Sequence, residues 1–190
     1  MLLGWRALFI GLLSLLIASV PFFAGAAPTV VPKSRIVRLF DTNKVRLALP
    51  RLASDPEPVP GSTNLYWIRP QPDRPDLKYV IFVARETLKN DERLLANKQL
   101  NEAVKKNLQS LGYQIIKMVN TGNTFVVDFR GVAEVPWQPL SPGVVRGTAK
   151  FFRTGNDLSG SILLCDPPQW KDKTTQSFRN VIGGTAVSRK

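Results

Sequence analysis

The feature that most constrains the fold of this sequence is the unbroken apolar run Tyr79-Val80-Ile81-Phe82-Val83-Ala84. In an extended chain, successive side chains point to opposite faces of a sheet, so this run presents apolar groups on both faces. A strand of this kind is typical of a sheet that is covered on both sides. The sequence therefore predicts a sheet with further elements packed against each of its faces.

Other segments predict further strands, and their connections indicate how the strands pair. Val45, Leu47 and Leu49 alternate with Arg46 and Ala48, as in a half-buried strand. The remaining predicted strands are residues 64–69, 114–120, 125–131, 144–153 and 159–165. Turns at Thr121-Gly122-Asn123 and Thr154-Gly155-Asn156-Asp157 predict hairpins and hence an antiparallel sheet. Residues 55–61 contain three prolines, which donate no backbone hydrogen bond, so we expect no regular ladder there.

The helical spacing of apolar residues predicts two helices. The first is capped by Asn90 or Asp91 and ends at Gly112. Its apolar positions are Leu100, Val104, Leu108 and Leu111. The second follows Asp166-Pro167-Pro168, where proline suits a first helical turn, and ends at Gly183-Gly184. The predicted fold class is therefore α+β: an antiparallel sheet with a central helix and a C-terminal helix.

The N-terminal segment has the pattern of an export signal. Arg6 precedes an apolar stretch, and Ala24-Gly25-Ala26 has the small-x-small pattern that precedes signal-peptide cleavage. We predict a signal peptide at 1–26, a tail at 27–35, a single α+β domain at 36–187 and a basic tail at 188–190. The alternative is an uncleaved membrane anchor over residues 7–27, a stretch of about bilayer-spanning length. Either form places the domain outside the cytoplasm, in a periplasm or a thylakoid lumen.

The composition excludes several kinds of chemistry. The chain has no His and one Cys, which excludes Ser-His-Asp, Cys-His and His-zinc sites. Cys165 ends an apolar run, so we predict a buried, unreactive thiol. No phosphate-binding glycine motif or calcium-loop spacing is present. We therefore predict no metal, no cofactor and no enzymatic activity, with a hydrolase that needs no His as the alternative.

Positive charge is the most informative surface property. Lys and Arg total 26 against 14 Asp and Glu, a formal net charge of +12. Arg146 and Lys150 share one side of a predicted strand, Arg38 and Arg46 add a polar face near the N-terminus, and Trp137 lies in a proline-rich loop. We predict that these five residues bind an acidic protein or a membrane-associated complex. Anionic lipid, acidic polysaccharide and a merely solvated sheet face are the alternatives. Nucleic acid is not expected, because the domain is exported.

The order strands, helix, strands, helix resembles the Mog1/PsbP-like α/β/α sandwich. The resemblance is carried by Val45-Arg46-Leu47-Ala48-Leu49-Pro50, by Leu111-Gly112-Tyr113 and by the unit that runs from Ser161-Ile162-Leu163-Leu164-Cys165 through Asp166-Pro167-Pro168-Gln169-Trp170 into the last helix. It covers residues 36–187 and implies a binding or assembly protein rather than an enzyme. For a photosynthetic source it implies a lumenal photosystem accessory protein. Histidines that bind metal in some PsbP proteins have no counterpart here, and no functional residue is carried over.

Overall fold

A computed structural model of the chain describes residues 38–42, 45–49, 52–60, 62–88, 93, 95–133, 140, 143–171, 173–183 and 186–187. The predicted signal peptide, both predicted tails and Trp137 lie outside the described residues. Within the described ranges, no helix combines the length and the apolar character that a membrane crossing requires.

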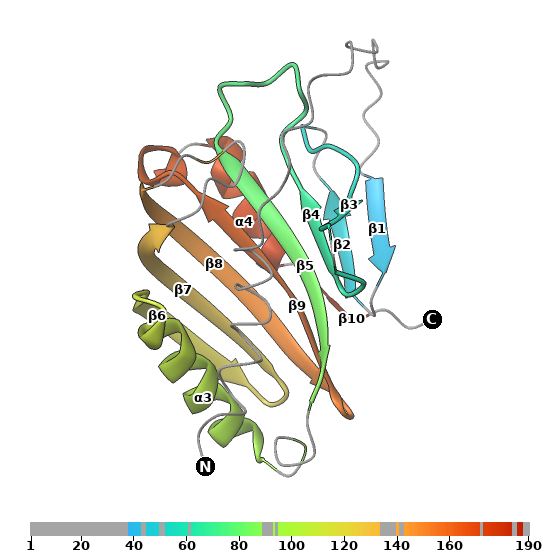
Figure 1. The fold of residues 1–190 in the computed structure, drawn as a ribbon, viewed down its shortest axis with the longest axis vertical. Helices are drawn as coiled ribbons and strands as arrows, with labels where there is room; N and C mark the ends of the chain where they lie inside the picture. Colours follow the sequence, from blue (N-terminus) through green and yellow to red (C-terminus); the bar gives the residue numbers. More distant parts are fainter. Residues whose placement is uncertain are drawn as a thin grey trace.

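In the described part of the chain, seven antiparallel strands form the main sheet, in the order β3-β4-β5-β9-β8-β7-β6 (Figure 1). The strands are β3 (Glu57–Pro58), β4 (Leu65–Ile68), β5 (Tyr79–Thr87), β6 (Gln114–Thr121), β7 (Thr124–Ala133), β8 (Gly143–Thr154) and β9 (Asp157–Cys165). Gly122 and Gly155 occupy the two predicted hairpin turns with φ of 61° and 59°, a backbone region that favours glycine. The predicted antiparallel sheet is confirmed.

Both faces of the sheet are covered at β5, as its apolar run predicted. On one face, Val80 and Phe82 pack into a core with helix α3 (Asn97–Ser110). On the other face, Tyr79 and Ile81 pack into a second core with the 3-10 helix η1 (Pro167–Lys171) and helix α4 (Lys173–Gly183). In Figure 1, α3 lies on the viewer's side of the sheet and α4 lies behind it. The predicted α+β class, with a central and a C-terminal helix, is therefore confirmed.

A second, smaller sheet joins the two ends of the domain. It consists of β1 (Arg38–Thr42), β2 (Val45–Leu49) and β10 (Ala186–Val187), with β2 in the middle. The alternation predicted for β2 is confirmed, because its three apolar residues are buried and Arg46 and Ala48 are exposed. The buried side of β2 packs into the same core as α4. The sequence did not predict β1 or β10, so the second sheet is an addition to the expected fold.

Helix α3 begins later than predicted. Leu95 and Ala96 are not helical, so a continuous helix from Asn90 or Asp91 is wrong; those two residues themselves lie outside the described residues. The Arg153 guanidinium, from β8, donates to the carbonyl oxygens of Arg93 and Leu95 and holds this segment away from the helix axis. The first turn is then closed by the Gln99 side chain, which accepts a bond from the Ala96 amide at 2.9 Å, half of a capping box.

The proline-rich segment 55–61 also differs from the prediction. Glu57 and Pro58 form a short ladder with Trp67 and Tyr66 of β4. Pro58 is tolerated because β3 is the edge of the sheet, where a missing donor leaves no partner strand unpaired. Glu57 strengthens the pairing through its Oε2, which accepts bonds from the Trp67 indole at 3.2 Å and from Arg69 at 2.6 Å.

Candidate functional site

One half of a face of the main sheet carries no packed element among those described. On the α4 side, β5 and β9 are covered by α4, η1 and the small sheet, and α4 also packs on β8. Beyond β8, the same face continues over β7 and β6. We call this half the open face; its residues are Lys117, Val119, Val126, Asp128, Arg130, Val132 and Val144.

The open face exposes large apolar side chains. Val132 on β7 and Val144 on β8 are cross-strand partners with 57% and 59% of their surface exposed. Val119 on β6 is 44% exposed and pairs with Val126. Val132 and Val144 form an exposed apolar pair at one end of the open face, and Val119 lies toward its other end. Exposed apolar side chains on a sheet face without a described cover are candidates for an interaction surface.

Cations lie in a row beside the exposed pair Val132 and Val144. The register places Arg130 of β7 between Gln114 of β6 and Arg146 of β8, with all three side chains on the same face. Arg130 Nε donates to Gln114 Oε1 at 2.7 Å, which fixes the guanidinium over the sheet. Lys117 adds a further cation beside Asp128. The open face and its border therefore present more positive than negative charge.

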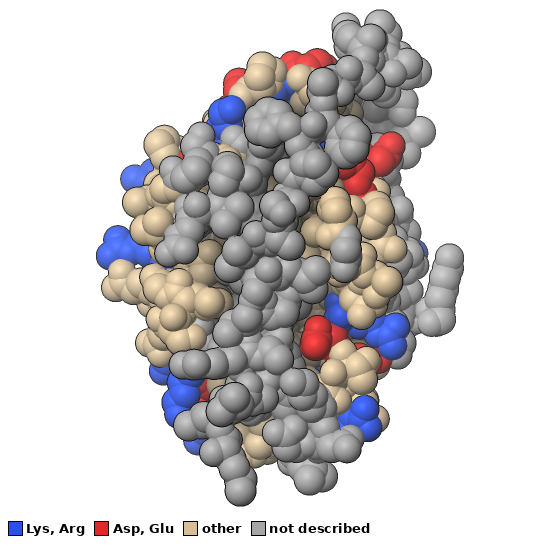
Figure 2. All heavy atoms as spheres, in the orientation of Figure 1, with Lys and Arg blue, Asp and Glu red and all other residues tan. Residues whose placement is uncertain are grey.

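The α3 side of the molecule has a different distribution of charge. Figure 2 shows this side, on which the Lys and Arg side chains are scattered along the margins with Asp and Glu among them. The described residues visible in that view form no single basic patch.

The border between the open face and the covered half is formed by an arginine–tryptophan cluster of Arg146, Trp170 and Arg179. Trp170 belongs to η1 and is a core residue, 4% exposed. Arg146 of β8 and Arg179 of α4 both place the guanidinium carbon over its indole ring, 4.6 Å and 4.4 Å from the ring centroid. Such contacts are attractive because the face of the indole ring carries negative charge density.

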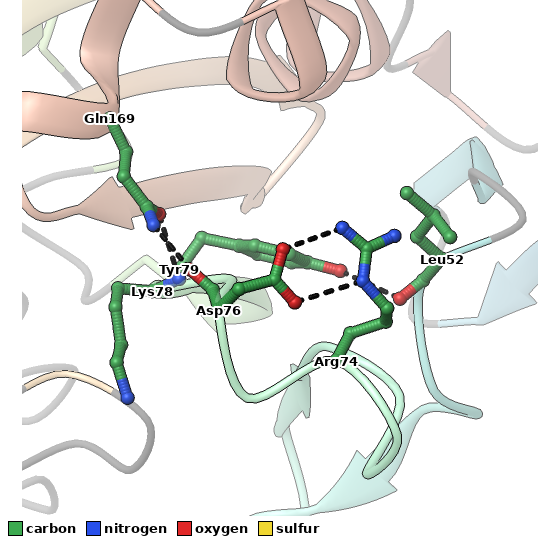
Figure 3. Close-up of polar contacts among 6 residues, drawn as sticks. All are labelled: Leu52, Arg74, Asp76, Lys78, Tyr79 and Gln169. Carbon is green, nitrogen blue, oxygen red and sulfur yellow. Dashed lines mark hydrogen bonds and ion pairs between the residues drawn. The ribbon is translucent and has the colours of Figure 1, made fainter.

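A polar clamp holds η1, and with it Trp170, in place (Figure 3). Gln169 accepts a bond from the Lys78 amide at 2.7 Å and donates to the Asp76 carbonyl oxygen at 2.5 Å. The turn that it grips is itself fixed, because Arg74 donates two bonds to the Asp76 carboxylate, at 2.9 and 2.6 Å. These bonds hold the pKa of Asp76 below its ordinary value. The clamp joins residues more than 90 positions apart in the sequence, so it sets where the cluster forms.

We expect Gln169→Leu to lower the free energy of unfolding by about 1 to 2 kcal/mol, because it leaves a backbone donor and a backbone acceptor without partners. Urea denaturation measures this change. Gln109→Leu, at an exposed position of α3, is the matched control and should change stability by less than about 0.5 kcal/mol. Equal effects at the two positions would show that the clamp does not hold η1.

The structure brings only some of the predicted binding residues together. Arg146 borders the open face, whereas Arg46 is exposed on β2 of the small sheet. Arg38 lies on β1, whose side chains are not among those described, and Trp137 lies outside the described residues. The binding roles predicted for these residues stay predictions.

Lys150 is on the predicted side of β8 but is already engaged. Its Nζ donates to the carbonyl oxygen of Gly183, at the C-terminus of α4, at 2.7 Å. Partial burial lowers the pKa of Lys150 below its ordinary value. A cation at this end of a helix interacts favourably with the helix dipole, so Lys150 fastens α4 to the sheet. Its predicted binding role also stays a prediction.

Arg179 is the residue that sequence reasoning missed. The structure places Trp170 and Arg179 on two separate helical segments, η1 and α4. The spacing of apolar residues in the sequence does not predict the angle between these segments, so Arg179 received no role. The only signal was that Trp170 and Arg179 both lie on the last predicted helix, which follows Asp166-Pro167-Pro168. Contact between the two depends on the bend between η1 and α4, which is a tertiary feature.

Cys165 offers no nucleophile. It is fully buried, as predicted, and burial raises the pKa of its thiol to about 12. The thiol therefore stays protonated, and a protonated thiol is a poor nucleophile at neutral pH. Within the described ranges, no group of three or more acidic residues or cysteines is arranged to hold a metal ion.

No protein-family model and no curated protein matches the sequence. Solved structures do match. The solution structure of cyanobacterial PsbP (CyanoP) from Synechocystis aligns with a TM-score of 0.53 and 15% identity, over 84% of this chain and 98% of that chain. A point mutant of Mog1 aligns with a TM-score of 0.50 and 12% identity, over 79% and 95%. The Ran-binding protein Mog1p of Saccharomyces cerevisiae aligns with a TM-score of 0.48 and 13% identity, over 79% and 94%.

These matches define the class of fold. The chain has a Mog1/PsbP-like fold, as the resemblance in the sequence predicted. Because the identities are 15% and 12%, the likeness concerns the fold alone. The chemistry of this chain has to be argued from its own residues.

Proposed function

We propose that this chain is a non-enzymatic binding or assembly domain that docks an acidic protein partner on the open face, after export directed by residues 1–26. The observation that carries the proposal is the cross-strand pair Val132 and Val144, more than half exposed on the open face and next to the pair Arg130 and Arg146. Protein interfaces commonly combine apolar contacts with polar and charged ones.

The charge pattern supports an acidic partner. Arg130 and Arg146 are cross-strand neighbours beside the two valines, and Lys117 lies on the adjacent edge strand. Complementary charge speeds association and selects the partner, while the buried apolar contacts retain it. Because these cations are at the surface, their contribution should weaken as salt shortens the screening length from about 10 Å at 0.1 M.

The site favours binding over catalysis. The side chains gathered on the open face are apolar or cationic, with Asp128 as their single carboxylate among the described residues. A hydrolase without His would need an activated hydroxyl, carboxylate or amine beside the substrate. The protonated, buried thiol of Cys165 cannot fill this role. The non-enzymatic proposal therefore rests on what the surface residues can do chemically.

The test is affinity capture with the exported domain as bait, compared with the double variant Val132→Asp plus Val144→Asp. We expect the wild-type domain to retain a protein with an acidic surface at low salt and the double variant to lose it by at least about tenfold. Two carboxylates in place of the exposed side chains of Val132 and Val144 would repel an acidic partner and would be costly to bury.

Ala48→Asp is the matched control, because it adds a carboxylate at an exposed strand position on the small sheet. It should retain the partner. Capture that is equal for wild type, the double variant and the control would contradict docking on the open face. Binding of the wild-type domain to anionic vesicles, in place of any protein, would favour the membrane alternative.

A further inference from the structure

The two guanidinium groups over Trp170 have no carboxylate partner within the described part of the chain. The ion pairs of the described residues involve Arg69, Arg74, Arg85 and Lys105, and neither Arg146 nor Arg179. Arg179 donates to the neutral amide of Gln176 at 3.1 Å. Two like charges are thus held against one ring without a neutralising group.

Arg146 carries a second sign of an unfilled site. Its Nε is buried, and no acceptor lies within hydrogen-bond distance of it. A buried donor without an acceptor costs about 1 to 3 kcal/mol, so native proteins rarely leave one unpaired unless a bound group supplies the acceptor. The Nε and one terminal nitrogen lie on the same edge of the guanidinium group. A carboxylate can accept a hydrogen bond from each of them, which makes a bidentate contact.

Asp166, the acidic residue that directly follows the buried Cys165, does not fill the site. Burial raises the pKa of Asp166, while the charge of Lys78 opposes that rise. Arg146 and Arg179 stack on the indole of Trp170. Within the described residues, no carboxylate pairs with either arginine.

The two arginines converge on one indole ring. Both guanidinium carbons lie within 4.6 Å of the same ring centroid, so their separation cannot exceed 9.0 Å, the sum of the two distances. The indole ring limits the motion of both arginines and so reduces the entropy lost on binding.

We infer that the arginine–tryptophan cluster is a carboxylate-binding site, which receives a Glu or Asp side chain of the protein partner as it docks on the adjacent open face. The inference rests on the proposed function and adds the contact that would bind an acidic side chain of the partner. The planar guanidinium is essential to it, since lysine keeps the charge but loses the bidentate geometry and the stacking.

The test uses the exported domain and two probes, a synthetic Glu-rich peptide and vesicles of phosphatidylglycerol. In the wild-type domain, the Nε–H NMR signals of Arg146 and Arg179 should shift on addition of the peptide at constant ionic strength. Arg146→Lys and Arg179→Lys should each weaken peptide binding by about tenfold, which corresponds to about 1.4 kcal/mol. Arg69→Lys is the matched control, because this arginine also stacks on a tryptophan, Trp67, but is paired with Glu57; it should bind as wild type does.

Three results would overturn the inference: peptide binding that is unchanged in both lysine variants, Nε–H signals that do not move, or binding to vesicles alone. The wild-type NMR measurement gives an answer even if a variant fails to fold. Failure here is distinguishable from failure of the proposed function, because loss of capture by the Val132 and Val144 double variant tests the open face without touching the arginines.

Discussion

Gly160→Ala is expected to lower the free energy of unfolding by about 3 kcal/mol, near the upper end of the cost of overpacking. An added Cβ would lie 2.3 Å from the carbonyl oxygen of Lys150 and 2.7 Å from Cδ1 of Phe151. The first of these atoms is backbone of β8, which pairs with β9 along its length. Relief of the clash requires the two central strands to separate, so no side-chain rotation can absorb it.

Urea denaturation of wild type and variant measures this change. Gly183→Ala is the matched control, because a Cβ there meets no atom within 4 Å. Its position at the end of α4 should make it neutral or slightly stabilising, by less than about 1 kcal/mol. A loss of less than about 1 kcal/mol for Gly160→Ala would mean that β8 and β9 move apart at little cost, contrary to the close-packed sheet centre.

The parts of the fold that were predicted from the sequence are those with local signals. The apolar run of β5 required cover on both faces, and Gly122 and Gly155 marked hairpin turns because their backbones adopt positive φ. The parts that were missed depend on distant residues. The two residues of β10 form a strand only because they pair with β2. Helix α3 starts directly after a segment that is bound by Arg153, a residue far along the chain.

The candidate site shows the same division. Strand alternation predicted that Arg146 and Lys150 share a face of β8, and the register confirms it. It could not predict that Lys150 is occupied by the C-terminus of α4, or that Arg179 joins Arg146 over Trp170. Those contacts depend on where η1 and α4 cross the sheet, which the clamp of Gln169 on residues 76–78 determines.

Trp170→Ala should have a larger effect than Gly160→Ala, a loss of about 4 kcal/mol in the free energy of unfolding. The indole is 4% exposed and belongs to the core between the sheet and α4, so its removal leaves a cavity as well as lost burial. It also removes the surface on which Arg146 and Arg179 stack, which leaves two adjacent cations without their shared ring. Urea denaturation measures the first effect, and the NMR titration with the Glu-rich peptide measures the second.

Trp170→Phe separates packing from recognition, because phenylalanine fills part of the cavity and keeps an aromatic face with a weaker attraction for cations. We expect this variant to lose about 1 to 2 kcal/mol of stability and to bind the peptide with intermediate affinity, between that of wild type and that of the lysine variants. A Trp170→Phe variant that is as unstable as Trp170→Ala yet binds the peptide fully would show that Trp170 serves the core alone. In that case the two guanidiniums are positioned by β8 and α4, and the ring contributes nothing to the carboxylate site.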